Sequence, residues 1–166
     1  IRLDGDFADC AYTYLVKNGG DWCEVIDPYA TATLADETKS FILNPEKAKV
    51  DLQNEKVKSS FDATDAVIYE VHIRDFTSDT TINFPGNSKF QRFIETGVKT
   101  AKGEAVGIDY LESLGITHVQ LLPIFDYGSI SERHQNNRYN WGYDPVQYNV
   151  PEGSYASNVQ NPYTRI

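Results

Sequence analysis

The residues best suited to chemistry in this 166-residue chain lie between Pro123 and Pro162. Aromatic side chains are dense there and alternate with amides and carboxylates; they are Tyr127, Tyr139, Trp141, Tyr143, Tyr148 and Tyr155, with Tyr163 just beyond. Rigid aromatic faces beside polar groups suit a sugar, whose ring offers apolar C–H faces and a rim of hydroxyls. The segment shows no clear strand or helix pattern, and loops this long in compact domains are usually functional. It is therefore predicted to be a carbohydrate-binding loop.

The elements before this loop are expected to position it. Residues 66–73 form an almost continuous β-branched and aromatic run, which is typical of a strand buried on both faces of a parallel sheet. After a long loop, residues 106–114 show the spacing of a short helix, and Gly115 follows as its terminator. Residues 116–122 form a second buried-type run. Strand, helix and strand in this order predict a βαβ unit with parallel strands, so the loop follows a carboxyl end, where such folds bind ligands.

The first 50 residues are predicted to be short strands and turns that form part of a β-sandwich. A hairpin is expected around Asn18 and Gly19, and Asp27-Pro28 should end its second strand. Asn44-Pro45-Glu46 is suited to a single helical turn, with Asn as the cap and Pro at the first position. The polar segment 53–65 has few apolar anchors and is the predicted domain boundary.

Cys10 and Cys23 flank the predicted hairpin. A turn at Asn18 and Gly19 would place Cys23 opposite roughly residue 14, with Cys10 about four residues, or ~13 Å, farther along the strand. That separation exceeds the ~7 Å limit between Cα atoms for a disulfide. Two free thiols favour a reducing, cytoplasmic compartment. Secretion or a cell-surface location is the alternative.

The charge of the chain excludes several classes of partner. Asp and Glu number 24 against 15 Lys and Arg, which gives a formal net charge of −9 with no basic block. Nucleic acid and anionic membranes are therefore not expected as partners. No apolar run approaches the ~20 residues that span a bilayer. The sequence begins with Ile1 and contains no Met, so we expect it to be a piece of a longer protein.

Several motifs resemble one enzyme family. YNWGYDP at residues 139–145, followed by VPEGSYAS, is similar to the type I pullulanases, the α-1,6-glucan debranching enzymes of the α-amylase superfamily. VIYEVHIRDF at 67–76 resembles the first barrel strand of that family. GIDYLESLGITHVQLLPIFDYGS at 107–129 resembles its first helix, second strand and following loop. Residues 12–16 and 27–30 resemble the end of the starch-binding-type β-sandwich that precedes the barrel.

The resemblance implies an α/β fold. Residues 1–52 would be the C-terminal part of the β-sandwich and 53–65 a linker. Residues 66–166 would be the N-terminal portion of an incomplete (β/α)8 TIM barrel, comprising its first strands, first helix and a long βα loop. The implied partners are an α-glucan oligosaccharide or polysaccharide and the remainder of the same barrel.

The resemblance also assigns roles within the loop. Tyr143 and Asp144 would line the subsite that holds the sugar just before the scissile bond, with the ring as a hydrophobic platform and the carboxylate as an acceptor for hydroxyls. Pro145 would hold Asp144 out of the helical region. Trp141 and Gly142 are expected to fix the loop rather than touch substrate.

No catalytic residue is expected within this chain. Retaining glycosidases need two carboxyl groups about 5 Å apart, and the resemblance places the family's catalytic acids on later strands, beyond Ile166. The segment would then supply a substrate-binding wall and be inactive alone. No cofactor is required by this interpretation, no metal ligands are predicted, and a structural calcium ion is left open.

Alternatives remain at both the residue and the protein level. His72, Arg74 and Asp75 could suggest a metal site or proton relay, but a hydrogen-bonded histidine at a strand end is favoured. Glu132, Arg133 and His134 are expected to be solvated, and Asp126 either caps the loop or faces the cleft. The full YNWGYDP string disfavours isoamylase and branching enzyme. A non-catalytic glucan-binding or interaction module is the alternative to a piece of a hydrolase.

Overall fold

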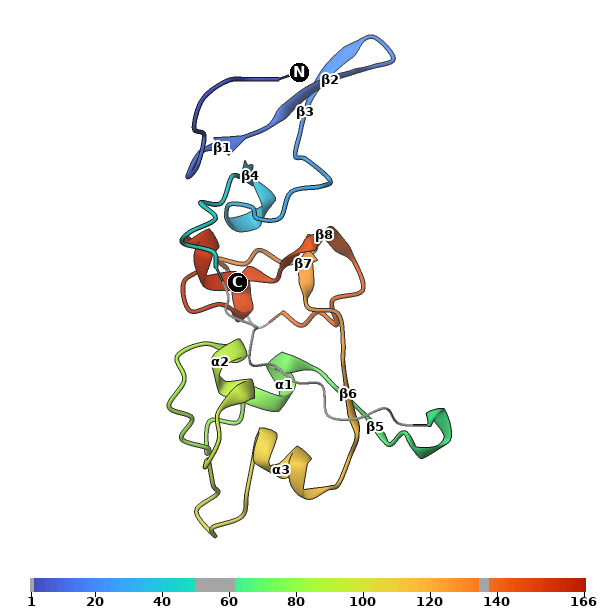
Figure 1. Cartoon of the computed structure of the whole chain (residues 1–166), viewed down its shortest axis with the longest axis vertical. Coiled ribbons are helices and arrows are strands. Elements are labelled where there is room, and N and C mark those ends of the chain that lie inside the picture. The colour runs from blue at the N-terminus through green and yellow to red at the C-terminus, as the bar shows by residue number, and fades with distance from the viewer. Residues whose placement is uncertain (1, 50–61, 135–137) are drawn as a thin grey trace. The chain divides into compact units, whose positions relative to one another are not determined.

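The computed structural model describes residues 2–49, 62–134 and 138–166 (Figure 1). The chain divides into two compact units. The first unit combines residues 1–50, 125–154 and 158–166, and the second combines residues 51–124 and 155–157. These groupings do not decide the domain boundaries proposed from the sequence, which stay a prediction. Most of the proposed linker, residues 53–61, lies outside the described residues.

The N-terminal part of the first unit consists of short antiparallel strands. Strand β1 (Ala11–Tyr12) pairs with β4 (Ser40–Phe41), and β2 (Tyr14–Asn18) pairs with β3 (Asp21–Val25) in a hairpin. A short 3-10 helix (Ala35–Glu37) lies between β3 and β4 along the chain. The turn predicted at residues 44–46 is confirmed, since Lys47 and Ala48 N–H groups donate to the Asn44 carbonyl.

The predicted register of the hairpin is wrong by two residues. Its turn is Gly19-Gly20, and Cys23 pairs with Val16 rather than with residue 14. The two glycines have φ values of +66° and +127°, which glycine adopts readily. The turn therefore forms at the glycine pair rather than at Asn18. The conclusion about the thiols is nevertheless confirmed, because Cys10 and Cys23 are both free and exposed.

The C-terminal part of the first unit corrects the prediction of a structureless loop. Strand β7 (Phe125–Tyr127) pairs antiparallel with β8 (Pro145–Pro151), with irregular register between them. In the middle of β8 only Gln147 and Val150 are buried, so its sequence lacks the apolar run or alternation that marks most strands. Two 3-10 helices, Gly153–Tyr155 and Pro162–Arg165, follow along the chain.

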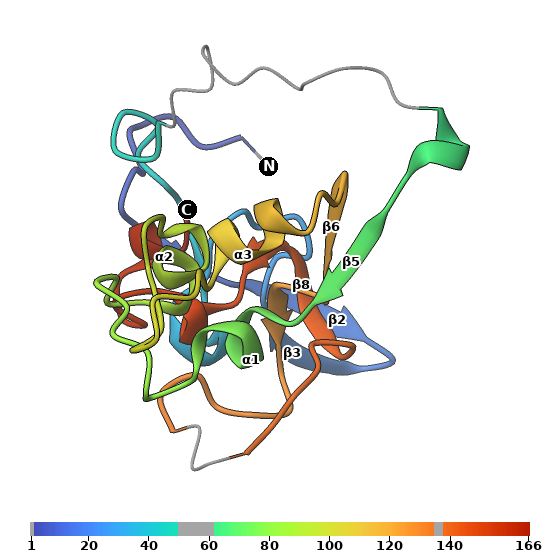
Figure 2. The same ribbon diagram turned by 90° about the horizontal axis from the view of Figure 1, so that it is seen from below.

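The second unit contains the predicted parallel pair. Strands β5 (Ile68–Val71) and β6 (His118–Leu121) pair in parallel from Ile68 opposite His118 to Val71 opposite Leu121, and Figure 2 shows them side by side. Helix α3 (Ile108–Ser113) lies between them along the chain, with Leu111 buried. Gly115 has a φ of +68°, as expected of a residue that ends a helix. The strand, helix and strand order is confirmed.

The first strand is shorter than predicted. It ends at Val71, and helix α1 (Ile73–Thr77) begins after His72. His72 caps this helix, because its Nδ1 accepts a hydrogen bond of 3.3 Å from the N–H of Asp75. The β-branched and aromatic composition of residues 66–73 concealed this local cap.

Besides α1, two short helices of the second unit were not predicted. Helix α2 (Lys89–Ile94) is capped by Ser88, whose hydroxyl accepts from the N–H of Gln91, and a 3-10 helix spans Ala63–Asp65. A serine followed three residues later by glutamine is a known helix-start pattern, so a signal for α2 was present. Phe76 of α1 packs against Phe93 of α2 with ring centroids 5.5 Å apart.

The parallel pair is more exposed than a strand buried on both faces would be. Ile68 is 60% exposed and Val119 is 41% exposed. The described residues therefore contain a βαβ unit but neither a closed barrel nor a complete sandwich. None of the described helices is both long enough and apolar enough to cross a bilayer.

Candidate functional site

The segment 139–145 is held by a hydrogen-bonded network centred on Asn140. The Asn140 Nδ2 group donates to Ser129 Oγ at 2.7 Å and to Asp144 Oδ1 at 2.8 Å. Its Oδ1 accepts from the N–H of Gly142 at 2.6 Å. Gly142 is buried and has a φ of +86°, which favours glycine. The side chain of Asn140 therefore fixes the path of the loop on both sides of Tyr143.

The predicted substrate-binding residues are accessible. Tyr143 is 64% exposed, and Tyr139 and Trp141 are also exposed. Asp144 directly follows Tyr143, and Pro145 begins strand β8, where it pairs with Tyr127 of β7. A proline at the first position of a strand is well tolerated. The loop thus presents an aromatic ring next to a carboxylate that a strand and an amide hold in place.

The environment of Asp144 favours its charged form. Partial burial raises the pKa of this carboxyl, but hydrogen bonds from Ser129 and Asn140 and from backbone groups outweigh that effect. The net result is a pKa below the ordinary value. Asp144 is consequently a carboxylate at neutral pH and can accept hydrogen bonds from hydroxyl groups.

A buried acid cluster lies in the same unit. It contains four carboxyl groups and one guanidinium, those of Glu37, Asp126, Glu132, Glu152 and Arg165. Arg165 Nη1 lies 3.2 Å from Asp126 Oδ2, and Arg165 Nη2 lies 2.7 Å from Glu132 Oε2. The two acids have side chains that are fully buried, and that of Arg165 is 1% exposed.

The expectation that Glu132 is solvated is wrong. Its two carboxylate oxygens accept hydrogen bonds from the N–H groups of Asp36 and Gly153, each at 2.8 Å, in addition to the ion pair with Arg165. These donors replace water and allow a charged group to be buried. Arg133 and His134, the other two members of this group, are exposed as expected. Asp126 neither caps the loop nor faces open solvent; it is fully buried and bonds to Thr33 and Arg165.

Ionising all four acids around a single arginine would cost considerable free energy, because the buried negative charges repel one another. Burial is the largest cause that raises the pKa of Glu37, to about 9, and a hydrogen bond to Asp126 adds to it. Burial also raises the pKa of Glu132 to about 7, against the opposing charge of Arg165, and that of Glu152 to about 6. Asp126 Oδ1 is buried and has no donor among the described residues. A proton on Glu37 supplies one.

Three carboxylates of the buried acid cluster are close enough together to hold a metal ion. Ligand oxygens of Glu37, Asp126 and Glu132 all lie within 4.8 Å of one another. Two of these acids, however, already bond to the guanidinium of Arg165, which supplies a positive charge at the same place. We therefore assign no metal ion to the cluster.

In the second unit, His72 has the structural role that was favoured over a metal site or a relay. It is buried, caps α1, and its Nε2 lies 3.2 Å from the hydroxyl of Tyr155. The two rings pack edge to face with centroids 6.1 Å apart. The histidine and tyrosine come from segments 83 residues apart, so this hydrogen bond joins the start of the unit to its last residues.

Sequence reasoning missed the residues that support the loop. Asn140 and Ser129 hold Asp144, and Arg165 balances the buried acids. Asn140 stands inside the YNWGYDP string, so the sequence offered a signal that this residue supports the loop. Arg165 offered none, because an isolated arginine near a proline-containing turn is usually exposed.

The chain is similar in sequence to known proteins, although no protein-family profile matches it. The pullulanase of Bacillus subtilis is 36% identical over 165 residues, which covers 99% of this chain and 23% of that protein.

Solved structures show the same similarity. A crystal structure of pullulanase from Paenibacillus barengoltzii in complex with maltohexaose and α-cyclodextrin is 41% identical, with a TM-score of 0.83 over 93% of this chain and 25% of that one. The pullulanase of Bacillus acidopullulyticus is 36% identical, with a TM-score of 0.88 over 99% and 20%. The chain thus spans about a quarter or less of the proteins that it matches.

Proposed function

From its homology to a segment of the pullulanases, we propose that this chain is part of a glycoside hydrolase that cleaves α-1,6 branch linkages in pullulan, amylopectin or glycogen-type glucans. The segment supplies a substrate-binding wall, and the catalytic carboxylates lie in the remainder of the protein. The enzyme acts with retention through two carboxyl groups and needs no organic cofactor. A cytoplasmic location is part of the proposal and rests on the two free thiols.

One observation carries the proposal for the site. An exposed aromatic ring, Tyr143, stands beside a carboxylate, Asp144, which Asn140 holds in place. Because the network around Asn140 is complete without a ligand, little reorganisation is needed when a sugar binds. The ring suits a C–H face of glucose and the carboxylate suits its hydroxyls. The match to a pullulanase crystallised with maltohexaose and α-cyclodextrin supports an α-glucan as the ligand.

The carboxyl pairs described in this chain are poor candidates for catalysis. A retaining pair must be about 5 Å apart and must reach the glycosidic bond. The carboxylates of Glu37, Asp126 and Glu132 meet the first condition. Asp126 and Glu132 fail the second, since both are buried and bonded to Arg165. This supports the placement of the catalytic acids in later parts of the protein.

The proposed fold assigns residues 66–166 to the start of a (β/α)8 barrel and residues 1–52 to the end of a β-sandwich. The parallel pairing of β5 and β6 around α3 supports the barrel. The exposure of Ile68 and Val119 supports a partner for these strands, which the proposal identifies as the remaining strands of the same barrel. A non-catalytic glucan-binding module is the second candidate, and the exposed side chains of Tyr143 and Asp144 are compatible with it.

The proposal is tested in the full-length protein with Tyr143→Ala. Loss of a contact that strengthens at the transition state should lower kcat/KM on pullulan by on the order of 10²-fold or more. Asp144→Asn keeps the shape, removes the charge, and should cause a comparable or smaller loss. Tyr148→Ala is the matched control, because this tyrosine is 66% exposed and contacts Phe125 rather than the loop.

Activity is measured on pullulan at limiting and saturating concentrations, together with melting temperatures. A loss at Tyr148 should follow stability, whereas a loss at Tyr143 should occur in a fully folded enzyme. If folded Tyr143→Ala protein kept wild-type kinetics, the loop would not be the substrate wall. If the wild-type protein bound α-glucan but hydrolysed none, the non-catalytic module would be the better description.

A further inference from the structure

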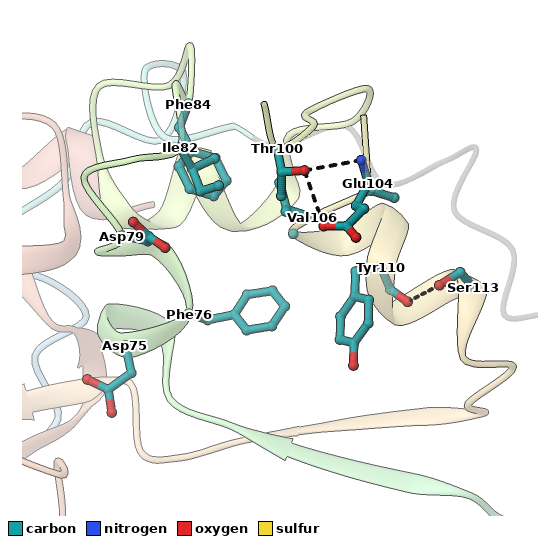
Figure 3. Close-up of a pocket in the computed structure, with 12 residues that line it drawn as sticks. Asp75, Phe76, Asp79, Ile82, Phe84, Thr100, Glu104, Val106, Tyr110 and Ser113 are labelled. Atoms are coloured by element: carbon teal, nitrogen blue, oxygen red, sulfur yellow. Dashed lines mark hydrogen bonds between the residues drawn. The ribbon is translucent and has the colours of Figure 1, made fainter. Parts of the chain in front are cut away.

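A pocket in the second unit has no role in the function proposed above. It has a volume of about 690 Å³ and is formed between α1, residues 79–84, residues 100–107 and one side of α3. Figure 3 shows the rings of Phe76 and Tyr110 projecting into this space from α1 and α3. Ile82, Phe84 and Val106 complete its apolar lining. The cavity lies within one unit.

The charged groups of the pocket are carboxylates, those of Asp75, Asp79 and Glu104, and hydroxyl groups line the rest of its polar surface. Asp79 Oδ1 accepts from the N–H and hydroxyl of Thr81 at 2.8 and 2.7 Å, and these bonds lower the pKa of the Asp79 carboxyl. Among the described residues, Asp79 Oδ2 receives no hydrogen bond. Glu104 and Thr100 belong to a tight turn in which Thr100 Oγ1 accepts from the N–H of Glu104. The pocket therefore presents carboxylate acceptors on a structured frame.

The residues that line the pocket indicate which class of ligand it can bind. No lysine, arginine or histidine lines the pocket, so phosphorylated or carboxylated ligands are disfavoured. Within the described ranges, only Glu37, Asp126 and Glu132 are close enough to chelate a metal, so the acids of this pocket are too far apart. A neutral ligand with an apolar face and several hydroxyl donors satisfies both the rings and the carboxylates. A pyranose ring has this character.

We propose that this pocket binds a glucose unit of an α-glucan chain, in addition to the loop of Tyr143 and Asp144. Phe76 and Tyr110 contact the C–H faces of the sugar, and Asp79 accepts hydrogen bonds from its hydroxyls. A second contact along a polysaccharide increases retention by raising the effective concentration of chain near the first contact. The identity of the ligand as a glucan rests on the proposed function.

The test measures glucan binding by the full-length protein in the Tyr143→Ala background, which weakens the loop site. Affinity electrophoresis in amylopectin gels and titration with maltotriose are the readouts. Tyr110→Ala and Asp79→Asn should each weaken binding by roughly five- to ten-fold, as expected for loss of one aromatic or polar contact. Tyr29→Ala is the matched control, since Tyr29 is 84% exposed and lies outside this pocket.

Asp79 is exposed, so Asp79→Asn should fold even if Tyr110→Ala does not. Glucan binding that is unchanged in both variants would overturn the inference. Pullulan hydrolysis is measured separately in the otherwise wild-type protein. A protein that loses binding in these variants but never hydrolyses pullulan would refute the proposed function alone. If the pocket variants bound glucan normally and the protein hydrolysed pullulan normally, only the proposal that the pocket binds glucan would be refuted.

Discussion

At the scale of single residues, the side chain of Asn140 determines how the loop presents Asp144. Its Nδ2 group donates to both Ser129 Oγ and Asp144 Oδ1, and its Oδ1 accepts from Gly142. The hydrogen bonds that lower the pKa of Asp144 include the one from Asn140. In the proposed function, Asn140 is thus a positioning residue, which acts on the glucan through Asp144.

Asn140→Ala in the full-length enzyme should therefore change the pH dependence of activity as well as its level. With one donor lost, the pKa of Asp144 rises toward its ordinary value, so the acidic limb of kcat/KM on pullulan should move to higher pH. We expect a loss of about ten-fold at neutral pH. A purely structural role would lower the melting temperature and leave the acidic limb in place. Asn149→Ala, on β8 and outside this network, is the control.

Arg165 is the one basic member of the buried acid cluster. Arg165→Ala leaves Asp126 and Glu132 buried without their shared partner, and breaking such a pair typically costs about 3–5 kcal/mol of unfolding free energy. Arg165→Lys should recover only part of this, because an ammonium cannot reproduce the two-pronged geometry of a guanidinium. Urea unfolding measures both variants. Equal stability of Arg165→Ala and the parent chain would contradict the assigned pairing.

At the scale of elements, the buried acid cluster predicts how stability depends on pH. Glu37, Glu132 and Glu152 have pKa values of about 9, 7 and 6 in the folded chain, against an ordinary value of 4.5. The folded state therefore binds more protons than the unfolded state above about pH 4.5. This contribution to stability is complete below that pH and is lost as the pH rises toward about 9. Melting temperatures should fall across this window.

Glu37→Gln tests the origin of this dependence. Glutamine cannot ionise, yet its amide can still donate to Asp126 Oδ1, which otherwise lacks a donor. The variant should melt about 3–6 °C higher than the parent at pH 9 and similarly at pH 5. Glu46→Gln is the control, because Glu46 is exposed. An unchanged pH profile in Glu37→Gln would show that another group is responsible.

The 3-10 helix that begins at Gly153 approaches this cluster closely. A Cβ at Gly153 would lie 2.2 Å from Glu132 Oε1 and 2.5 Å from Arg165 Cζ, and neither side chain has free space to move into. Gly153→Ala should cost about 2–4 kcal/mol in urea unfolding. Gly103→Ala is the comparison, since a Cβ there meets nothing and only its φ of +84° is strained. It should cost about 1 kcal/mol. A smaller loss at Gly153 than at Gly103 would contradict this description of the close approach.

The elements also show how far sequence reasoning reached. The predicted parallel strands 66–73 and 116–122 contain the observed strands 68–71 and 118–121, because β-branched runs have a strong local signal, and Gly115 ended α3 as expected. Strand β8 was missed because its backbone is satisfied by pairing with β7, a contact that its own sequence does not encode. Glu132 was placed in solvent because its partner Arg165 is 33 residues away. Local sequence patterns were sufficient to predict single strands and helices. They did not reveal which residues pair across a long separation in the sequence.

At the scale of the whole molecule, the exposed faces of β5 and β6 predict association. Parallel strands are normally covered on both faces, yet Val67, Ile68, Val119 and Leu121 are each at least 36% exposed. Such surface favours contact with another chain or with the rest of the proposed barrel. Expressed alone, residues 1–166 should self-associate and lack hydrolytic activity. Light scattering and urea unfolding would contradict this if they showed a monodisperse monomer that unfolds cooperatively.

The first unit is assembled from the two ends of the chain, and this has a consequence for biosynthesis. Thr33 bonds to Asp126, Asp27 to Gln147 and Asn44 to Tyr163, across 93, 120 and 119 residues. A ribosome adds about 5–20 residues each second, so Asp27, Thr33 and Asn44 wait on the order of ten seconds for these partners. During that interval residues 51–124, which contain β5 and β6, emerge and can pair. The N-terminal strands can pair with one another early, but chaperones would meet them before the C-terminal residues of the same unit have been made.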